Sequence, residues 1–174
     1  MLQAEQWLPA TPDAVWSFVS DCRHMNHVIP PFIRFEVTGW NGRPAAQHDA
    51  PPPPVAEGGA YDYRLHLHGI GVRWRTLVTE AEAPNRFVDE QARGPYAFFS
   101  HEHTFQASDG GTLTRDVIRY RPPGGPLAPL IDRLSVRRDL RRLFTHRHAR
   151  LAELFADGGE PARLLDTDPK RPTS

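Results

Sequence analysis

The chain has one cysteine, no net charge and no long apolar run, and each shortage excludes a class of protein. Among its 174 residues Cys22 is the single cysteine, so no internal disulfide framework can form. Basic and acidic side chains number 21 each, which leaves no overall field to attract nucleic acid or a membrane surface. With no apolar stretch long enough to span a bilayer and no signal peptide, we expect a cytoplasmic protein without membrane insertion.

Motifs of nucleotide and hydrolase chemistry are missing as well. The sequence contains no Gly-x-Gly-x-x-Gly, no phosphate-binding P-loop, no nucleophile elbow and no Cys-x-x-Cys. Nucleotide-driven chemistry and serine hydrolysis are therefore not expected, and neither is a cofactor. Cys22 falls on a predicted helix and is interpreted as a small packing residue, not a nucleophile.

Hydrophobic periodicity predicts one strand, two short helices, a run of about six strands and one long C-terminal helix. The first strand covers 3–9, and Thr11-Pro12-Asp13 then has the hydroxyl, proline and acid that start a helix. Alternation of apolar and polar residues predicts the later strands at 32–40, 61–68, 72–82, 86–93, 98–106 and 112–120.

The last predicted helix, residues 127–156, is amphipathic. Its apolar stripe consists of Leu130, Leu134, Leu140, Leu143, Phe144, Leu151, Leu154 and Phe155. Arginines occupy much of the remainder, at Arg133, Arg137, Arg138, Arg141, Arg142, Arg147 and Arg150. Because the whole chain is neutral, we interpret these arginines as a solvated face and expect no nucleic-acid partner.

Two segments lack this periodicity. Residues 41–59 contain four consecutive prolines among Gly and Ala, and are predicted to be an exposed, mobile loop inserted in the domain. Residues 158–174, with three prolines, are predicted to be a disordered tail. The remaining chain, 1–157, is expected to form a single ligand-binding domain.

The element order and several local motifs resemble the START-like (SRPBCC) superfamily, nearest to its bacterial polyketide cyclase/dehydrase-like and coenzyme-Q-binding-like branch. The matching pieces are Pro12-Asp13-Ala14-Val15-Trp16-Ser17-Phe18, Pro30-Pro31-Phe32, Tyr61-Asp62-Tyr63-Arg64-Leu65, Trp74-Arg75-Thr76, residues 86–91, Arg93-Gly94-Pro95-Tyr96, His101-Glu102-His103-Thr104-Phe105 and Gly110-Gly111-Thr112. The resemblance implies an α+β helix-grip fold, with a curved antiparallel sheet of about six to seven strands around the long C-terminal helix. A single helix cannot fill such a concavity, so a ligand cavity is expected between helix and sheet.

Two histidines share the apolar face of the strand predicted at 98–106. That face carries Phe99, His101, His103 and Phe105. In the register set by a three-residue turn before this strand, Asp89 lies opposite His101. In the register set by a four-residue turn after it, Asp116 lies opposite His103, and a slip of one residue would destroy either pairing.

These four residues, His101, His103, Asp89 and Asp116, are the candidate catalytic groups. A carboxylate that orients an imidazole could make it a general base or acid on a carbonyl-bearing ligand. The same groups could instead form a satisfied polar network that shapes the pocket, or, with His-x-His ligand chemistry, hold a metal. We expect no metal, and the second His-x-His pair, His66 and His68, is predicted to face solvent.

Ten residues are expected to contact a ligand in the cavity, although ordinary core packing is an alternative for each aromatic side chain. They are Tyr63, Trp74, Gln91, Arg93, Phe99, Phe105, Ile118, Tyr120, Leu140 and Phe144. The first hypothesis is the binding of a small hydrophobic or aromatic molecule that is polyketide-, quinone- or lipid-like. A cyclase or dehydratase using the carboxylate–histidine pairs, and an interaction or stress-related domain with a vestigial cavity, are the alternatives. The sequence leaves the oligomeric state open.

Overall fold

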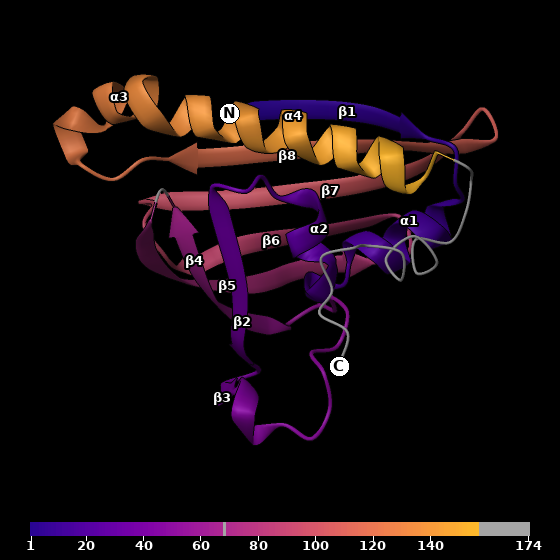
Figure 1. The fold of residues 1–174 in the computed structure, drawn as a ribbon, viewed down its shortest axis with the longest axis horizontal. Helices are drawn as coiled ribbons and strands as arrows, with labels where there is room; N and C mark the ends of the chain where they lie inside the picture. The colour runs from indigo at the N-terminus through magenta and orange to yellow at the C-terminus, as the bar shows by residue number, and fades with distance from the viewer. Residues whose placement is uncertain (68, 157–174) are drawn as a thin grey trace.

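A computed structural model describes residues 1–67 and 69–156 of the chain (Figure 1). His68 and the predicted tail, 158–174, lie outside the described residues. No helix in the described ranges is long and apolar enough to cross a membrane.

One curved antiparallel sheet forms the body of the protein, in the strand order β1-β8-β7-β6-β5-β4-β2-β3. The strands are β1 (Leu2–Leu8), β2 (Ile33–Trp40), β3 (Arg43–Pro44), β4 (Ala60–Leu67), β5 (Ile70–Glu82), β6 (Arg86–Arg93), β7 (Phe98–Ser108) and β8 (Gly111–Arg121). The predicted α+β helix-grip architecture is confirmed. The strand count is slightly higher than expected, at eight, because the two-residue β3 pairs with the end of β2.

The helices cover one face of this sheet, which we call the inner face; the opposite one is the outer face. Helix α1 (Pro12–Val19) begins as predicted, with the Thr11 hydroxyl accepting a hydrogen bond from the backbone N–H of Ala14. Helix α2 (Met25–Val28) follows a turn of 3-10 helix. The long helix α4 (Arg137–Leu154) contacts β1 and α2, and in Figure 1 it runs in front of β1 and β8.

The C-terminal helix is less regular than its sequence predicts. A short α3 (Ala128–Ile131) leads into the π-helical turn Asp132–Val136, and only then does α4 begin. A π turn inserts an extra residue, so the apolar stripe before it is rotated away from the stripe after it. As a result Leu130 and Leu134, predicted to face inward, are 54% and 63% exposed.

The core lies between the helices and the inner face of the sheet. Near the end of α4, Phe155 and Leu151 pack with Phe18 of α1 and with Phe87 and Phe105 of the sheet. Nearer the start of α4, Leu140 and Phe144 pack on Ile118 of β8. Cys22 is buried with Trp40 and Tyr61, and burial raises the pKa of its thiol to about 11, which agrees with a packing role.

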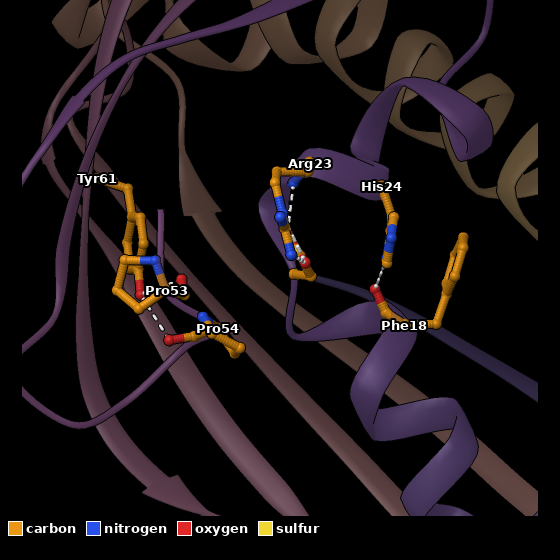
Figure 2. A network of polar contacts seen from close by, with 7 residues as sticks. Phe18, Arg23, His24, Pro53, Pro54 and Tyr61 are labelled. Atoms are coloured by element: carbon orange, nitrogen blue, oxygen red, sulfur yellow. Dashed lines mark hydrogen bonds and ion pairs between the residues drawn. The ribbon is translucent and has the colours of Figure 1, made fainter. Parts of the chain in front are cut away.

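The proline-rich segment makes specific contacts with the rest of the domain that its composition does not predict. The Tyr61 hydroxyl reaches the carbonyl oxygens of Pro53 and Pro54, at 3.2 and 2.9 Å (Figure 2). The backbone N–H of Val55 donates to the Ser20 carbonyl at 2.9 Å, and the Val55 side chain packs against two parts of the core. Prolines supply carbonyl acceptors even though they cannot join a strand ladder, so a buried tyrosine can anchor this segment.

Tyr61 therefore allows a test of the anchored loop. Replacing Tyr61 by Phe keeps the packing but removes the hydroxyl, and should lower the free energy of unfolding by about 0.5–1.5 kcal/mol. Urea unfolding measures this change. Tyr96→Phe is the matched control, because within the described ranges the Tyr96 hydroxyl makes no hydrogen bond; equal stabilities for wild type and Tyr61→Phe would contradict the anchoring.

Candidate functional site

Four polar side chains from three adjacent strands converge on the inner face beneath α4. Residue His101 of β7 lies opposite Asp89 of β6, and His103 lies opposite Asp116 of β8, so both predicted registers are confirmed. The β7–β8 turn is tighter than predicted. Ser108 pairs with Gly111, leaving only Asp109 and Gly110, both with positive φ, as the loop.

The side-chain contacts differ from the simple pairs expected from that register. Nε2 of His101 hydrogen-bonds Oδ1 of Asp116 at 2.9 Å, while Nε2 of His103 hydrogen-bonds Oδ2 of Asp89 at 3.2 Å. Nδ1 of His103 also lies 2.9 Å from Oδ1 of Asp116, without the alignment of a hydrogen bond. Asp116 therefore contacts both imidazoles and Asp89 contacts His103, because the side chains lean along the strands instead of meeting only their direct partners.

The two imidazoles, whose ring centroids are 3.7 Å apart, have pKa values that are shifted in opposite directions. Burial and the neighbouring His103 lower the pKa of His101. Burial also acts to lower the pKa of His103, but the close contact with Asp116, the hydrogen bond with Asp89 and the charges of both carboxylates outweigh it and raise that pKa. His101 is thus favoured as a neutral base beside a protonated His103.

Asp116 remains ionised although it is buried. Burial acts to raise its pKa, yet the Arg147 charge, the hydrogen bond with His101 and the close contact with His103 hold that pKa well below its usual range. A buried carboxylate needs such compensation, because an uncompensated buried charge is strongly destabilising.

Arg147 is a candidate site residue that the sequence analysis missed. It was counted with the solvated arginines, but it is only 7% exposed and lies on the inner side of α4. Its Nε is buried, and within residues 1–67 and 69–156 it makes no hydrogen bond. A signal was available, because Arg147 is three residues after Phe144 and four before Leu151, which places it on the apolar stripe.

Half-buried aromatic rings continue the inner face away from the histidines. Phe99 lies 6.5 Å from the His101 ring and 5.1 Å from Trp74, and Tyr96 lies 5.2 Å from Phe99 and 6.0 Å from Tyr120. Trp74, Phe99 and Tyr120 are expected ligand-contacting residues, whereas Tyr96 was not predicted. We call Trp74, Tyr96, Phe99 and Tyr120 the aromatic cluster.

The other expected ligand-contacting residues fall into different environments. Tyr63 lies farther along the sheet, with its ring 4.5 Å from Phe35. Four apolar side chains are buried in the core itself, namely Phe105, Ile118, Leu140 and Phe144. Of these, Phe144 lies 5.8 Å from the His101 ring and borders the polar network.

Gln91 and Arg93 are placed differently from the prediction. The Gln91 amide bonds both the backbone carbonyl and the N–H of Tyr96, at 2.9 and 3.1 Å, so it holds the β6–β7 turn together. Thr76 pairs with Gln91 and Arg75 with Arg93, which leaves Ala92 as an extra residue in a β-bulge. The bulge moves Arg93 from the predicted inner face to the outer face.

A metal remains an alternative use of part of this network. Asp89, His101 and His103 each offer one ligand atom, and these atoms lie within 4.8 Å of one another. However, the two histidine Nε2 atoms already bond carboxylates, and the Arg147 charge acts on the same cluster. The side chains that could bind a metal are therefore already paired with each other and balanced by the charge of Arg147. The expectation of no metal stays a prediction.

A groove of about 760 Å³ runs along α4 beside the α2–β2 connection. Its walls are Pro30, Phe32, Arg133, Arg137, Arg138, Arg141, Arg142, Thr145, His146 and Ala149. This positively charged side of the helix is exposed, as the sequence predicted for most of its arginines.

The charge states of the two imidazoles can be measured directly. In a nuclear magnetic resonance titration, His101 should titrate below and His103 above the ordinary value of about 6.5. The folded-state pKa of His103 is raised above its unfolded value of about 6.5. Its contribution to stability should therefore be complete below about pH 6.5 and should be lost as the pH rises through the folded-state pKa. In Asp116→Asn the His103 pKa should fall; identical titrations of both rings would contradict this account.

Comparison with known proteins identifies a family whose model matches most of the chain. Residues 8–148 match the family model described as polyketide cyclase / dehydrase and lipid transport. No curated protein matches the chain.

Solved structures share the fold at low sequence identity. A protein of Chromobacterium violaceum is 17% identical with a TM-score of 0.64, over 88% of this chain and 95% of that one. A protein of Thermus thermophilus is 18% identical with a TM-score of 0.60, over 87% and 97%. A protein of Arthrobacter aurescens is 15% identical with a TM-score of 0.62, over 87% and 85%. These likenesses support the fold alone.

Proposed function

The chain belongs to the polyketide cyclase / dehydrase and lipid transport family, and from this premise we propose that it binds a small, largely apolar or aromatic molecule between the inner face and α4. The ligand would be polyketide-, quinone- or lipid-like, with at least one polar oxygen. Its apolar part would contact the aromatic cluster, and its oxygen would approach Arg147 and His101.

The observation that carries this proposal is the buried Arg147. A guanidinium has five N–H donors, and a buried donor without a partner costs about 1–3 kcal/mol. Arg147 is 7% exposed, and its buried Nε makes no hydrogen bond within the described part of the chain. Its charge supports ionised Asp116, but its free N–H groups suit a carbonyl or carboxylate oxygen of a ligand.

The aromatic cluster complements this polar end. Phe99 joins the cluster to the His101 ring, so apolar walls and polar groups form one continuous surface. Two members are already oriented by hydrogen bonds: Trp74 to the Thr76 hydroxyl at 3.0 Å and Tyr120 to Asp132 at 2.7 Å. Rigid aromatic walls with a few fixed polar groups are typical of sites for flat or extended ligands.

A cyclase or dehydratase activity is the second candidate, and the neutral His101 favours it. With Nε2 donating to Asp116, the other ring nitrogen, Nδ1, carries the basic lone pair. Such a base could remove a proton from a carbon next to a carbonyl, while Arg147 stabilises the oxygen that gains negative charge. His103, protonated between two carboxylates, would position this base and would not react itself.

Ligand binding is tested by native mass spectrometry of protein purified from its own host. We expect a stoichiometric organic molecule on the wild type and a loss of occupancy of about tenfold or more in Arg147→Met, since one charge-assisted hydrogen bond supports about that difference. Arg121→Met, an exposed arginine on β8, is the matched control and should keep full occupancy. Wild-type protein without any bound molecule, or equal occupancy in all three proteins, would contradict the proposal.

Catalysis is tested by incubating the extracted molecule with wild type, His101→Gln and His103→Gln, and following its mass and retention time. If the protein is an enzyme, His101→Gln should lower turnover by about 10²–10⁴-fold, the usual contribution of a general base. His103→Gln should shift the pH dependence of the rate, since it alters the His101 pKa. Turnover that is unchanged in His101→Gln would leave binding as the function.

A further inference from the structure

We propose a second binding site, on the outer face of the sheet, for a small molecule carrying two neighbouring phosphate groups. A cleft of about 250 Å³ lies there, over β4, β5 and β6 and under the β2–β3 hairpin. Five arginines line it: Arg43, Arg64, Arg73, Arg75 and Arg93. Its arginines lie on the face opposite α4, although Trp74, whose ring belongs to the aromatic cluster of the inner face, also contributes to its lining.

The strand register forces arginines against each other in this cleft. Arg64 of β4 lies directly opposite Arg73 of β5, and Arg75 of β5 lies directly opposite Arg93 of β6. Directly opposed side chains are about 4.5–5.5 Å apart at Cβ, and like charges at that spacing destabilise a sheet. Since a β-bulge brings Arg93 to this face, the second pair exists only because β6 contains an extra residue.

The carboxylates nearby neutralise only one of the five arginines. Among the lining residues Asp62 is the one acid, and both its oxygens already bond Arg75, at 2.7 and 2.8 Å. Glu36 lies opposite Arg64 but forms no ion pair with it. In the described ranges Arg64, Arg73 and Arg93 have neither an ion pair nor a hydrogen bond, so their guanidinium groups are free to bind an anion.

The hairpin above the sheet makes these arginines line a cleft instead of a flat surface. Gly42, with φ of +81°, turns the chain so that Arg43 and Pro44 form one wall. A side chain at Gly39 would not be tolerated, because a Cβ there would lie 2.5 Å from the Arg43 carbonyl oxygen. Glycine at position 39 therefore allows the wall to close against β2.

The size and charge of the cleft identify its occupant. About 250 Å³ suits a small molecule, not a nucleic-acid duplex or a membrane surface. Arginine binds phosphate oxygens with two parallel hydrogen bonds, and the four strand arginines run diagonally over three strands in two adjacent pairs. The Arg64/Arg73 pair offers two free guanidinium groups to one phosphate, and Arg93, beside the Asp62-bound Arg75, offers a third to the other, so a diphosphate would bridge them.

The test uses inorganic pyrophosphate as the probe in isothermal titration calorimetry at about 0.1 M salt, where distant charges are screened. Wild type should bind one pyrophosphate, about tenfold more tightly than orthophosphate. Arg73→Gln/Arg93→Gln removes one arginine of each pair and should weaken binding by about tenfold or more. The control, Arg119→Gln/Arg121→Gln, removes the same charge from exposed positions of β8 and should change the affinity by less than about twofold.

Unfolding temperature gives a second measurement that does not depend on the probe. Without an anion, Arg73→Gln/Arg93→Gln should raise this temperature by a few degrees, because it relieves two like-charge contacts. Pyrophosphate should raise it in the wild type but not in that variant. The proposal is overturned if both double variants lose affinity equally, if neither does, or if a single-stranded oligonucleotide or anionic vesicles bind more tightly than pyrophosphate through the same arginines.

Discussion

The proposed site depends on the charge–charge interactions of one buried carboxylate, that of Asp116. It contacts both histidines of β7 and is stabilised by the charge of Arg147 from α4. Because its charge cannot stay buried without these partners, sheet and helix must come together in one arrangement. The same contacts lower the pKa of His101 and raise the pKa of His103, so the two histidines of the inner face are not equivalent.

Around this network the inner face has one part whose side chains are fully buried and one part whose side chains are half-buried. The part of the inner face near the end of α4 is closed by fully buried side chains such as Phe155 and Phe105. The part near the start of α4 carries half-buried rings, and there the π turn moves Leu130 and Leu134 out to solvent. A helix that is irregular at one end can thus complete a core at the other end while leaving its irregular end exposed.

Much of the framework could be predicted from the sequence. Alternation located the strands, the Thr11-Pro12 cap located α1, and the turns fixed the registers that place Asp89 opposite His101 and Asp116 opposite His103. These features are local, since each depends on residues within one strand or one hairpin. Composition was less informative for the proline-rich segment. Its prolines and glycines predict a mobile loop, but they do not predict the hydrogen bonds that this segment forms with Tyr61 and with the Ser20 carbonyl.

The sequence by itself therefore determined the element order, the hairpin registers and the residue types available on each face. Only the tertiary structure decided that Asp116 serves both histidines, that Arg147 is buried above them, and that Arg93 belongs to the outer face. The physical reason is that local periodicity fixes the direction of a side chain from its own strand or helix. Diagonal contacts, a π turn and a β-bulge shift that direction, and their positions depend on how distant segments pack.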